Sequence, residues 1–207
     1  MDPGMFRLLS MFYIHWRYFL LLLWPFPLSC DYSLNCIPMI QTSDDNRIIE
    51  ALAFYLFLVS SAVLGFQRYF EKPQKSKKKV VVNPEIKARW LVYLFAWAII
   101  IISFFPSSNF LVFVGTLIGE RLLYFPSIGF SILFAWIWWH IYQTPYAIKH
   151  LASLIFITWI VWQCTVTVNR NVDWRNEEAL FRAAETVCGE SAKVQEVSTN
   201  FFDSYLS

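Results

Sequence analysis

The side chains best suited to chemistry gather in residues 119–127, whose sequence is GERLLYFPS. This stretch places the Glu120 carboxylate, the Arg121 guanidinium and the Tyr124 phenol at the start of a long apolar run. Ionisable groups at the depth of a membrane are candidates for function, and an arginine offers a phosphate several charge-assisted hydrogen bonds. The alternative is structural, with Glu120 and Arg121 at the polar end of a helix and Tyr124 in an aromatic belt at the interface.

Two further groups of ionisable residues allow both a functional and a structural interpretation. Asp44 and Asp45 could hold a divalent metal or divide acid and base roles, but together with Asn46 they are typical of a helix N-cap, which we favour. His15 and Arg17 lie inside an apolar run, where Arg17 could pair with an acid on another helix. The membrane segment could instead begin only after Arg17. We predict no metal site.

No motif supports a hydrolase or a nucleotide-driven enzyme, because the HExxH, GxSxG and P-loop patterns are all absent from the sequence. The four cysteines, Cys30, Cys36, Cys164 and Cys188, also lack the short spacing of a metal-binding pair. A disulfide between Cys30 and Cys36 is one interpretation. The alternative is that both remain free thiols near the membrane interface.

These groups must be positioned by a membrane protein, because the composition is too apolar for an ordinary soluble domain. Of 207 residues, 57% are hydrophobic, 19% are aromatic and only 15% are charged, and the mean hydropathy is +0.44. A hydrocarbon core about 30 Å thick needs roughly 20 apolar helical residues. We therefore predict an all-α, polytopic protein with about five transmembrane helices, near residues 8–28, 48–66, 90–105, 122–142 and 151–168.

The basic residues predict an orientation for these segments. Eight of them lie between the second and third segments, at Arg68, Lys72, Lys75, Lys77, Lys78, Lys79, Lys87 and Arg89. By the positive-inside rule loop 67–89 is cytoplasmic, and five crossings then place the N-terminus in the cytosol and residues 169–207 on the luminal side. The lysine run could also bind anionic lipid headgroups. Nucleic-acid binding does not suit a loop held between two membrane segments.

Local signals predict where two of the helices begin. Residues 83–85 indicate a helix entry near Pro84, since proline suits a first helical turn. After residue 168 the sequence becomes polar, and the apolar spacing of residues 173–181 with early acidic residues predicts a short amphipathic helix. We expect no removable signal peptide at the N-terminus.

With these blocks in view, the chain resembles the transmembrane and tetratricopeptide-repeat (TMTC) family of protein O-mannosyltransferases. Three stretches carry the resemblance, namely YFLLLLWP, DYS and CIP within residues 18–38, GERLLYFPS at residues 119–127, and NVDWRNEE with LFR within residues 171–182. Their order and spacing match the family from about Tyr18 to Gln195. The resemblance implies the C-terminal part of a GT-C-like glycosyltransferase membrane domain, followed by a short luminal helical tail that starts a truncated tetratricopeptide repeat.

The resemblance also implies an activity, which is transfer of mannose from dolichyl-phosphate-mannose to serine or threonine of luminal proteins at the endoplasmic reticulum membrane. This reaction needs a carboxylate base for the acceptor hydroxyl and cations for the departing phosphate. We expect the catalytic carboxylate to lie upstream of this chain, which alone would be inactive, and Asp44 and Asp45 do not take its place. For the donor phosphate we expect Arg121 assisted by Tyr124, with Glu120 orienting Arg121.

The partners that follow are membrane lipid, the lipid-linked donor and luminal acceptor proteins, without a further cofactor. Two other classes of protein remain as alternatives. A non-catalytic membrane subunit would hold a partner with its luminal loops. A transporter would need ionisable residues near the middle of several membrane segments, and the second, third and fifth segments have none there.

Overall fold

The computed structural model describes residues 3–32, 36–71, 84–108, 118–192, 194–197 and 199. Within these ranges every regular element is a helix, which confirms the predicted all-α class. The α-helices are α1 (Pro3–Leu23), α2 (Arg47–Phe70), α3 (Pro84–Phe104), α4 (Tyr124–Tyr142), α5 (Tyr146–Asp173) and α6 (Glu177–Cys188), and the two 3-10 turns are η1 (Phe105–Ser107) and η2 (Glu120–Leu123).

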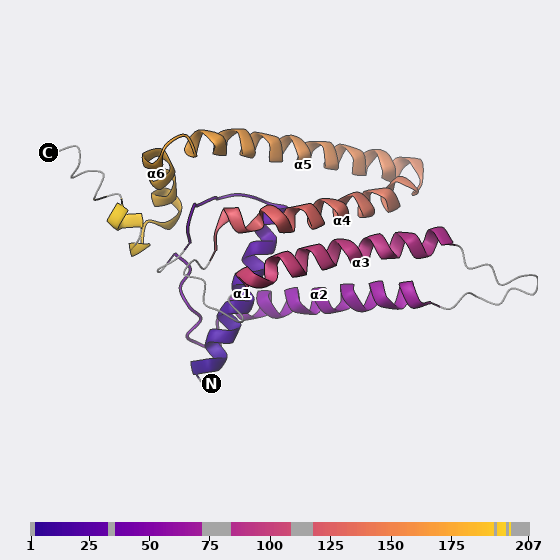
Figure 1. Ribbon diagram of the computed structural model, residues 1–207, viewed down its shortest axis with the longest axis horizontal. Coiled ribbons are helices and arrows are strands. Elements are labelled where there is room, and N and C mark those ends of the chain that lie inside the picture. Colours follow the sequence, from indigo (N-terminus) through magenta and orange to yellow (C-terminus); the bar gives the residue numbers. More distant parts are fainter. Residues whose placement is uncertain are drawn as a thin grey trace, which may run out of the picture.

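Four helices in the described part of the chain are long and apolar enough to cross a membrane. They are Arg47–Phe70, Glu85–Phe104, Glu120–Tyr142 and Ile148–Asp173, which correspond to the second to fifth predicted segments. Figure 1 shows them as a bundle of long helices with similar directions. No more than 22% of the residues in any of these apolar windows is buried inside the protein, as expected for helices that face lipid. The chain is therefore a multi-pass helical membrane protein.

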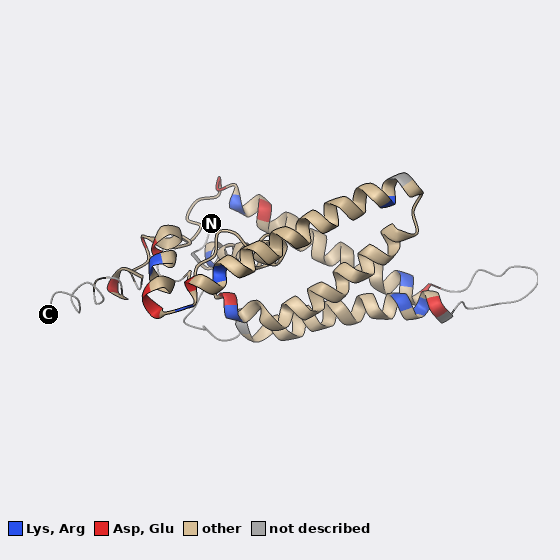
Figure 2. Ribbon diagram, turned by 90° about the horizontal axis from the view of Figure 1, so that it is seen from above, with Lys and Arg blue, Asp and Glu red and all other residues tan. Residues whose placement is uncertain are grey.

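The two ends of this bundle differ in chemistry. At one end α2 finishes and α3 begins, and Figure 2 shows Lys and Arg positions of the ribbon gathered there. The sequence places Arg68 near the end of α2, and Lys87 and Arg89 near the start of α3. We call this end of the bundle the basic end. At the opposite end α2 and α4 begin, α3 and α5 finish, and α6 lies beyond them (Figure 1). We call this opposite end the cap end.

The first predicted segment behaves differently from the other four. α1 is helical, but it is not among the helices found long and apolar enough to span, and it runs across the cap end at a steep inclination to the bundle (Figure 1). It also ends at Leu23 rather than at residue 28. Pro25 and Pro27 explain the early end, because proline has no N–H to donate and disfavours helix in the residue before it.

The remaining helix boundaries agree with the local signals, with two corrections. α3 begins at Pro84 as predicted, and the amphipathic helix after the fifth segment is α6, whose N-cap Asn176 accepts the backbone N–H of Ala179 at 2.7 Å. α5 continues to Asp173, five residues beyond the predicted end at residue 168. The extra turn matters because it carries the charged residues of the cap end.

The second correction concerns the predicted N-cap of α2. The cap residue is Asn46, whose side chain makes no capping hydrogen bond. The Asp45 carboxylate accepts the backbone N–H of Arg47 at 3.0 Å and the Arg47 Nε at 2.9 Å, and these hydrogen bonds lower the pKa of Asp45. Asp45 therefore serves a local ion pair. No group of three or more metal-ligating side chains occurs among the described residues.

Small residues allow the closest helix contacts. A Cβ on Gly129 of α4 would lie 2.7 Å from the Ala96 carbonyl oxygen of α3, and a Cβ on Gly65 of α2 would lie 2.7 Å from the Tyr93 ring. Packing without side-chain bulk is a common way for membrane helices to associate. A buried cluster joins α3 to α4. It consists of Tyr93, Ala96 and Trp97 of α3 and Leu133 of α4.

Candidate functional site

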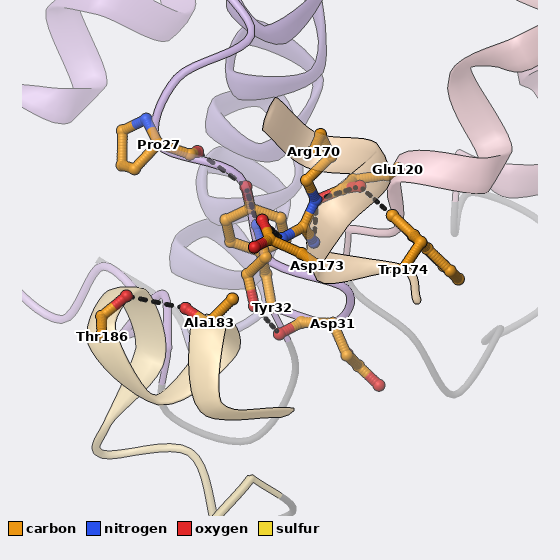
Figure 3. A network of polar contacts seen from close by, with 10 residues as sticks. Pro27, Asp31, Tyr32, Glu120, Arg170, Asp173, Trp174, Ala183 and Thr186 are labelled. Carbon is orange, nitrogen blue, oxygen red and sulfur yellow. Dashed lines mark hydrogen bonds and ion pairs between the residues drawn. The ribbon is translucent and has the colours of Figure 1, made fainter. Parts of the chain in front are cut away.

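A network of charged side chains joins η2 to the end of α5 (Figure 3). The Arg170 guanidinium donates to both oxygens of Glu120, from Nη2 at 2.7 Å and from Nε at 3.1 Å. Its Nη1 donates to Asp173 at 2.9 Å, and Trp174 Nε1 donates to Glu120 at 3.4 Å. The side chains of Arg170 and Glu120 are only 9% and 14% exposed. This is a bidentate, largely buried ion pair between residues 50 positions apart in the sequence.

The network corrects the role expected for Glu120. We expected Glu120 to orient Arg121, but its two oxygens are bound by Arg170 and Trp174. A buried carboxylate is costly without a cation beside it, and Arg170 of α5 is the cation that pairs with Glu120. Arg121 is exposed and Tyr124 is 72% exposed. Of the three predicted residues, Glu120 is held in the ion pair with Arg170, whereas Arg121 and Tyr124 are exposed at the cap end.

The segment after α1 is held against this network by a tyrosine that sequence reasoning did not single out. Tyr32 is 2% exposed, and its hydroxyl donates to the Pro27 carbonyl at 3.0 Å and accepts the Ser29 N–H at 2.9 Å. Its own N–H donates to the Ile118 carbonyl at 3.2 Å. Burial raises the pKa of Tyr32 to about 12, so the phenol stays neutral at physiological pH. Asp31, next to it, is also buried.

A disulfide closes the cap end, and it is not the one expected. Cys36 is bonded to Cys188 of α6, 152 residues further along the chain, whereas Cys30 is a free thiol. The predicted pairing of Cys30 with Cys36 is therefore wrong. Burial raises the pKa of the Cys30 thiol, which disfavours its reactive thiolate form. The observed bond ties the loop before α2 to the helix after α5, which local spacing in the sequence cannot indicate.

His15 and Arg17 in α1 have different surroundings. The two ring nitrogens of His15 contact the Tyr55 hydroxyl and, at 2.8 Å, the carbonyl oxygen of Ser108, so the imidazole connects α1 to α2 and to the turn after α3. No ion pair of Arg17 is found in the part of the chain that the structure describes. The predicted pairing of Arg17 with an acid on another helix is thus not seen there.

Among the cavities beside α1 and the segment after it, two differ in the chemistry of their walls. One, of about 350 Å³, lies between α1 and the cap-end halves of α2 and α3, with apolar walls that include Phe19, Phe54 and Trp97. The other, of about 500 Å³, lies between residues 25–28, α5 and α6, and includes the polar residues Asn169, Arg170 and Asp173 in its walls. The first is suited to an apolar chain and the second to polar groups or water.

The fold and this site define the class as a multi-pass helical membrane protein with a largely buried ion pair at one end of the bundle. Comparison with known proteins gives the family. Residues 1–59 match the family model described as Protein O-mannosyl-transferase TMTC, DUF1736. Over 84% of its length the chain is 33% identical to protein O-mannosyl-transferase TMTC3 of Mus musculus and 30% identical to TMTC4 of the same species, of which it covers 17% and 21%.

A third relative, protein O-mannosyl-transferase TMTC2 of Homo sapiens, is 28% identical over 88% of this chain and is covered to 27% of its own length. These matches support the TMTC family over the region that the chain shares with these proteins, which is the family that the three sequence blocks indicated. It spans between about a sixth and a quarter of the length of these relatives. No solved structure matches it.

Proposed function

We propose that this chain forms part of the membrane domain of a protein O-mannosyltransferase of the endoplasmic reticulum. The enzyme would transfer mannose from dolichyl-phosphate-mannose to serine or threonine of luminal proteins. The observation that carries the proposal is the relationship over 84% of the chain to proteins named protein O-mannosyl-transferases. Lipid around the helices, the lipid-linked donor and luminal acceptor proteins are the partners that this function requires.

The proposed reaction assigns a limited part to these residues. The bond between the anomeric carbon of mannose and the donor phosphate breaks, and the acceptor hydroxyl oxygen bonds to that carbon. Its proton passes to a carboxylate base, for which we assign no residue of this chain. The departing phosphate carries negative charge and needs a cation. We assign this role to Arg121 with Tyr124, which are exposed at the cap end.

Glu120 enters this proposal only indirectly. Its pairing with Arg170 fixes η2, and η2 contains Arg121 and leads directly into Tyr124 of α4. The Arg170 guanidinium itself is shared by two carboxylates, so the network carries a formal charge of −1 and does not favour a phosphate. Arg121, which no described carboxylate neutralises, is the better candidate.

The orientation of the bundle supports a cap end in the lumen. The eight basic residues of loop 67–89 favour a cytosolic basic end, and the three later crossings by α3, α4 and α5 would bring the chain to the lumen at α6. The disulfide between Cys36 and Cys188 gives independent support, because disulfides persist in the lumen of the endoplasmic reticulum and are rare in the cytosol. Residues 169–192 and the tetratricopeptide repeat that we expect them to start would then be luminal.

Donor binding tests the assignment directly. Purified protein in detergent would be irradiated with a photoreactive analogue of dolichyl-phosphate-mannose, in competition with unlabelled donor. We expect Arg121→Ala to reduce specific labelling about tenfold or more, and Arg121→Lys to retain part of it. Arg175→Ala is the matched control, because Arg175 is an exposed arginine at the same end of the bundle. Equal labelling of the native protein and Arg121→Ala would remove Arg121 from the site.

A non-catalytic membrane subunit is the second candidate. It is favoured by the disulfide that holds α6 firmly on the cap end, as a scaffold for a luminal partner would require. The two candidates differ in a glycosylation assay with an acceptor peptide. Mannose transfer by this chain would exclude the subunit, and donor labelling that fails for the native protein would exclude the enzyme.

A further inference from the structure

One face of the middle of α1 packs against the cap, and another face packs against the cap-end half of α2. Ile14, Tyr18 and Leu21 share one buried cluster with Tyr32 and Cys188, the last of which belongs to the disulfide of α6. The Tyr18 hydroxyl also accepts the N–H of Gly119, just before η2. A transmembrane helix would place its middle at the midplane of the bilayer. The middle of α1 lies instead beside cap-end segments, namely the loop with Tyr32 before α2, Gly119 before η2, and Cys188 of α6.

The C-terminal end of α1 reaches deeper. Trp159 Nε1 of α5 donates to the carbonyl oxygen of Leu23 at 2.9 Å, and the ring of Trp24 stacks on Trp162 at a centroid distance of 4.7 Å. Trp159 precedes Arg170 by 11 residues, which is roughly 16 Å along an α-helix. This is about half of a hydrocarbon core of roughly 30 Å. α1 therefore enters obliquely from the cap end and stops partway through.

The chain then returns to the end from which it came. Residues 25–28 line the second cavity together with Trp162, Asn169 and Asp173, which follow one another toward the cap end along one face of α5. Four residues after Leu28, the N–H of Tyr32 is bonded to the carbonyl of Ile118 at the cap end, at 3.2 Å. Descent by α1 and return by an extended segment together form a hairpin.

We propose that residues 3–32 form a re-entrant hairpin, which enters and leaves the bilayer from the cap side and lines a water-accessible vestibule there. The chain then crosses the membrane four times, and its N-terminus lies on the same side as α6. This replaces the predicted first span and the predicted cytosolic N-terminus. It also removes a cost, since Arg17 near the cap avoids the bilayer centre, where a charge is unfavourable.

The vestibule follows from the needs of the backbone. An extended segment has no internal ladder of hydrogen bonds, and non-helical backbone at membrane depth is tolerated only inside protein or beside water. The Tyr32 hydroxyl serves the Pro27 carbonyl and the Ser29 N–H, and Ser29 Oγ donates to the Asp31 carbonyl at 3.0 Å. The cavity of about 500 Å³ beside residues 25–28 has room and polar partners for water molecules, which could bond the remaining backbone groups of this segment.

Cysteine accessibility tests the vestibule. In a Cys30→Ser, Cys164→Ser background, Thr165→Cys and Asn169→Cys would be exposed to a charged, membrane-impermeant thiosulfonate applied to opened microsomes. Both positions line the cavity, whereas Thr167 lies between them on α5 and is not part of its lining. We expect Thr165→Cys to react at least tenfold faster than Thr167→Cys, although Thr165 lies deeper. Retention of the Cys36 to Cys188 disulfide confirms that each variant is folded. An unreactive Thr165→Cys, or equal rates at residues 165 and 167, would overturn the vestibule.

Glycosylation mapping tests the hairpin. An Asn-Gly-Ser acceptor site on a hydrophilic spacer would be added before Met1, within loop 72–83, or after Ser207. We expect modification at both termini and none in the loop. Modification after Ser207 but not before Met1 would show that the termini lie on opposite sides and would refute the hairpin. Modification of the loop alone would leave the hairpin standing and reverse the orientation proposed above.

Discussion

Replacing Arg170 with methionine removes a cation that two carboxylates share. The Glu120 side chain is 14% exposed and would lose both of its hydrogen bonds to the guanidinium, while Asp173, at 37% exposure, can turn to water. Breaking a buried ion pair by removing one partner costs about 3–5 kcal/mol, because the other charge stays buried. We assign most of this cost to Glu120, and expect Arg170→Met to destabilise the protein by about 3 kcal/mol.

The measurement is thermal and denaturant unfolding of the purified protein in a mild detergent. Arg182→Met is the matched control, because Arg182 forms an ion pair with Glu178 at 2.8 Å but its side chain is 68% exposed. An exposed pair of this kind contributes only about 0.3–0.5 kcal/mol. Arg170→Met should therefore lower the stability several times more than Arg182→Met does.

A double variant separates the ion pair from general damage to α5. In Arg170→Met with Glu120→Gln, no buried charge remains without a partner, so the two losses should be less than additive, with a coupling of about 1–3 kcal/mol. Strict additivity would contradict the pairing. A loss for Arg170→Met no larger than that for Arg182→Met would show that the Glu120 carboxylate is solvated in the membrane protein.

Three further changes test the packing and the cap. Gly129→Leu should destabilise the protein by about 1–3 kcal/mol or more in the same unfolding assay, because even a Cβ would lie 2.7 Å from a backbone oxygen of α3. Gly4→Leu is the control and should not destabilise it, because a Cβ on Gly4 has nothing within 4 Å. Cys188→Ser should abolish the mobility difference between reduced and oxidised protein on a gel and cost about 2–5 kcal/mol, and an unchanged mobility pattern would contradict the disulfide. Asn176→Ala removes the N-cap of α6 and should cost about 1 kcal/mol, seen as faster hydrogen exchange at the start of α6, and unchanged exchange there would contradict the cap.

Much of this fold could be predicted because its signals are local. The four long apolar runs, the helix entry at Pro84 and the amphipathic pattern of α6 each depend on residues within a few turns of one another. The direction of α1 could not be predicted in the same way. Its direction depends on packing against Tyr32 and Cys188, which come later in the chain.

The sequence drew attention to Glu120 but not to its partner, and the donor-phosphate role of Arg121 and Tyr124 stays a prediction. Residues 119–127 do lie where charged groups gather, yet the partner of Glu120 is Arg170, 50 residues away on another helix. Arg170 stood in a run of polar residues at the end of a span, where a snorkelling cation is ordinary and gives no signal of a buried pair. The pairing of Cys36 with Cys188 was hidden for the same reason, since sequence spacing says nothing about which ends of helices meet.

The separation of 152 residues between Cys36 and Cys188 has a consequence for biosynthesis. A ribosome makes Cys36 first and Cys188 only after all four spanning helices have been synthesised. Throughout that interval Cys188 is absent, so the Cys36 thiol cannot form its native disulfide. Formation of the final bond therefore reports that all four spanning helices have been made and that α6 has reached the loop before α2.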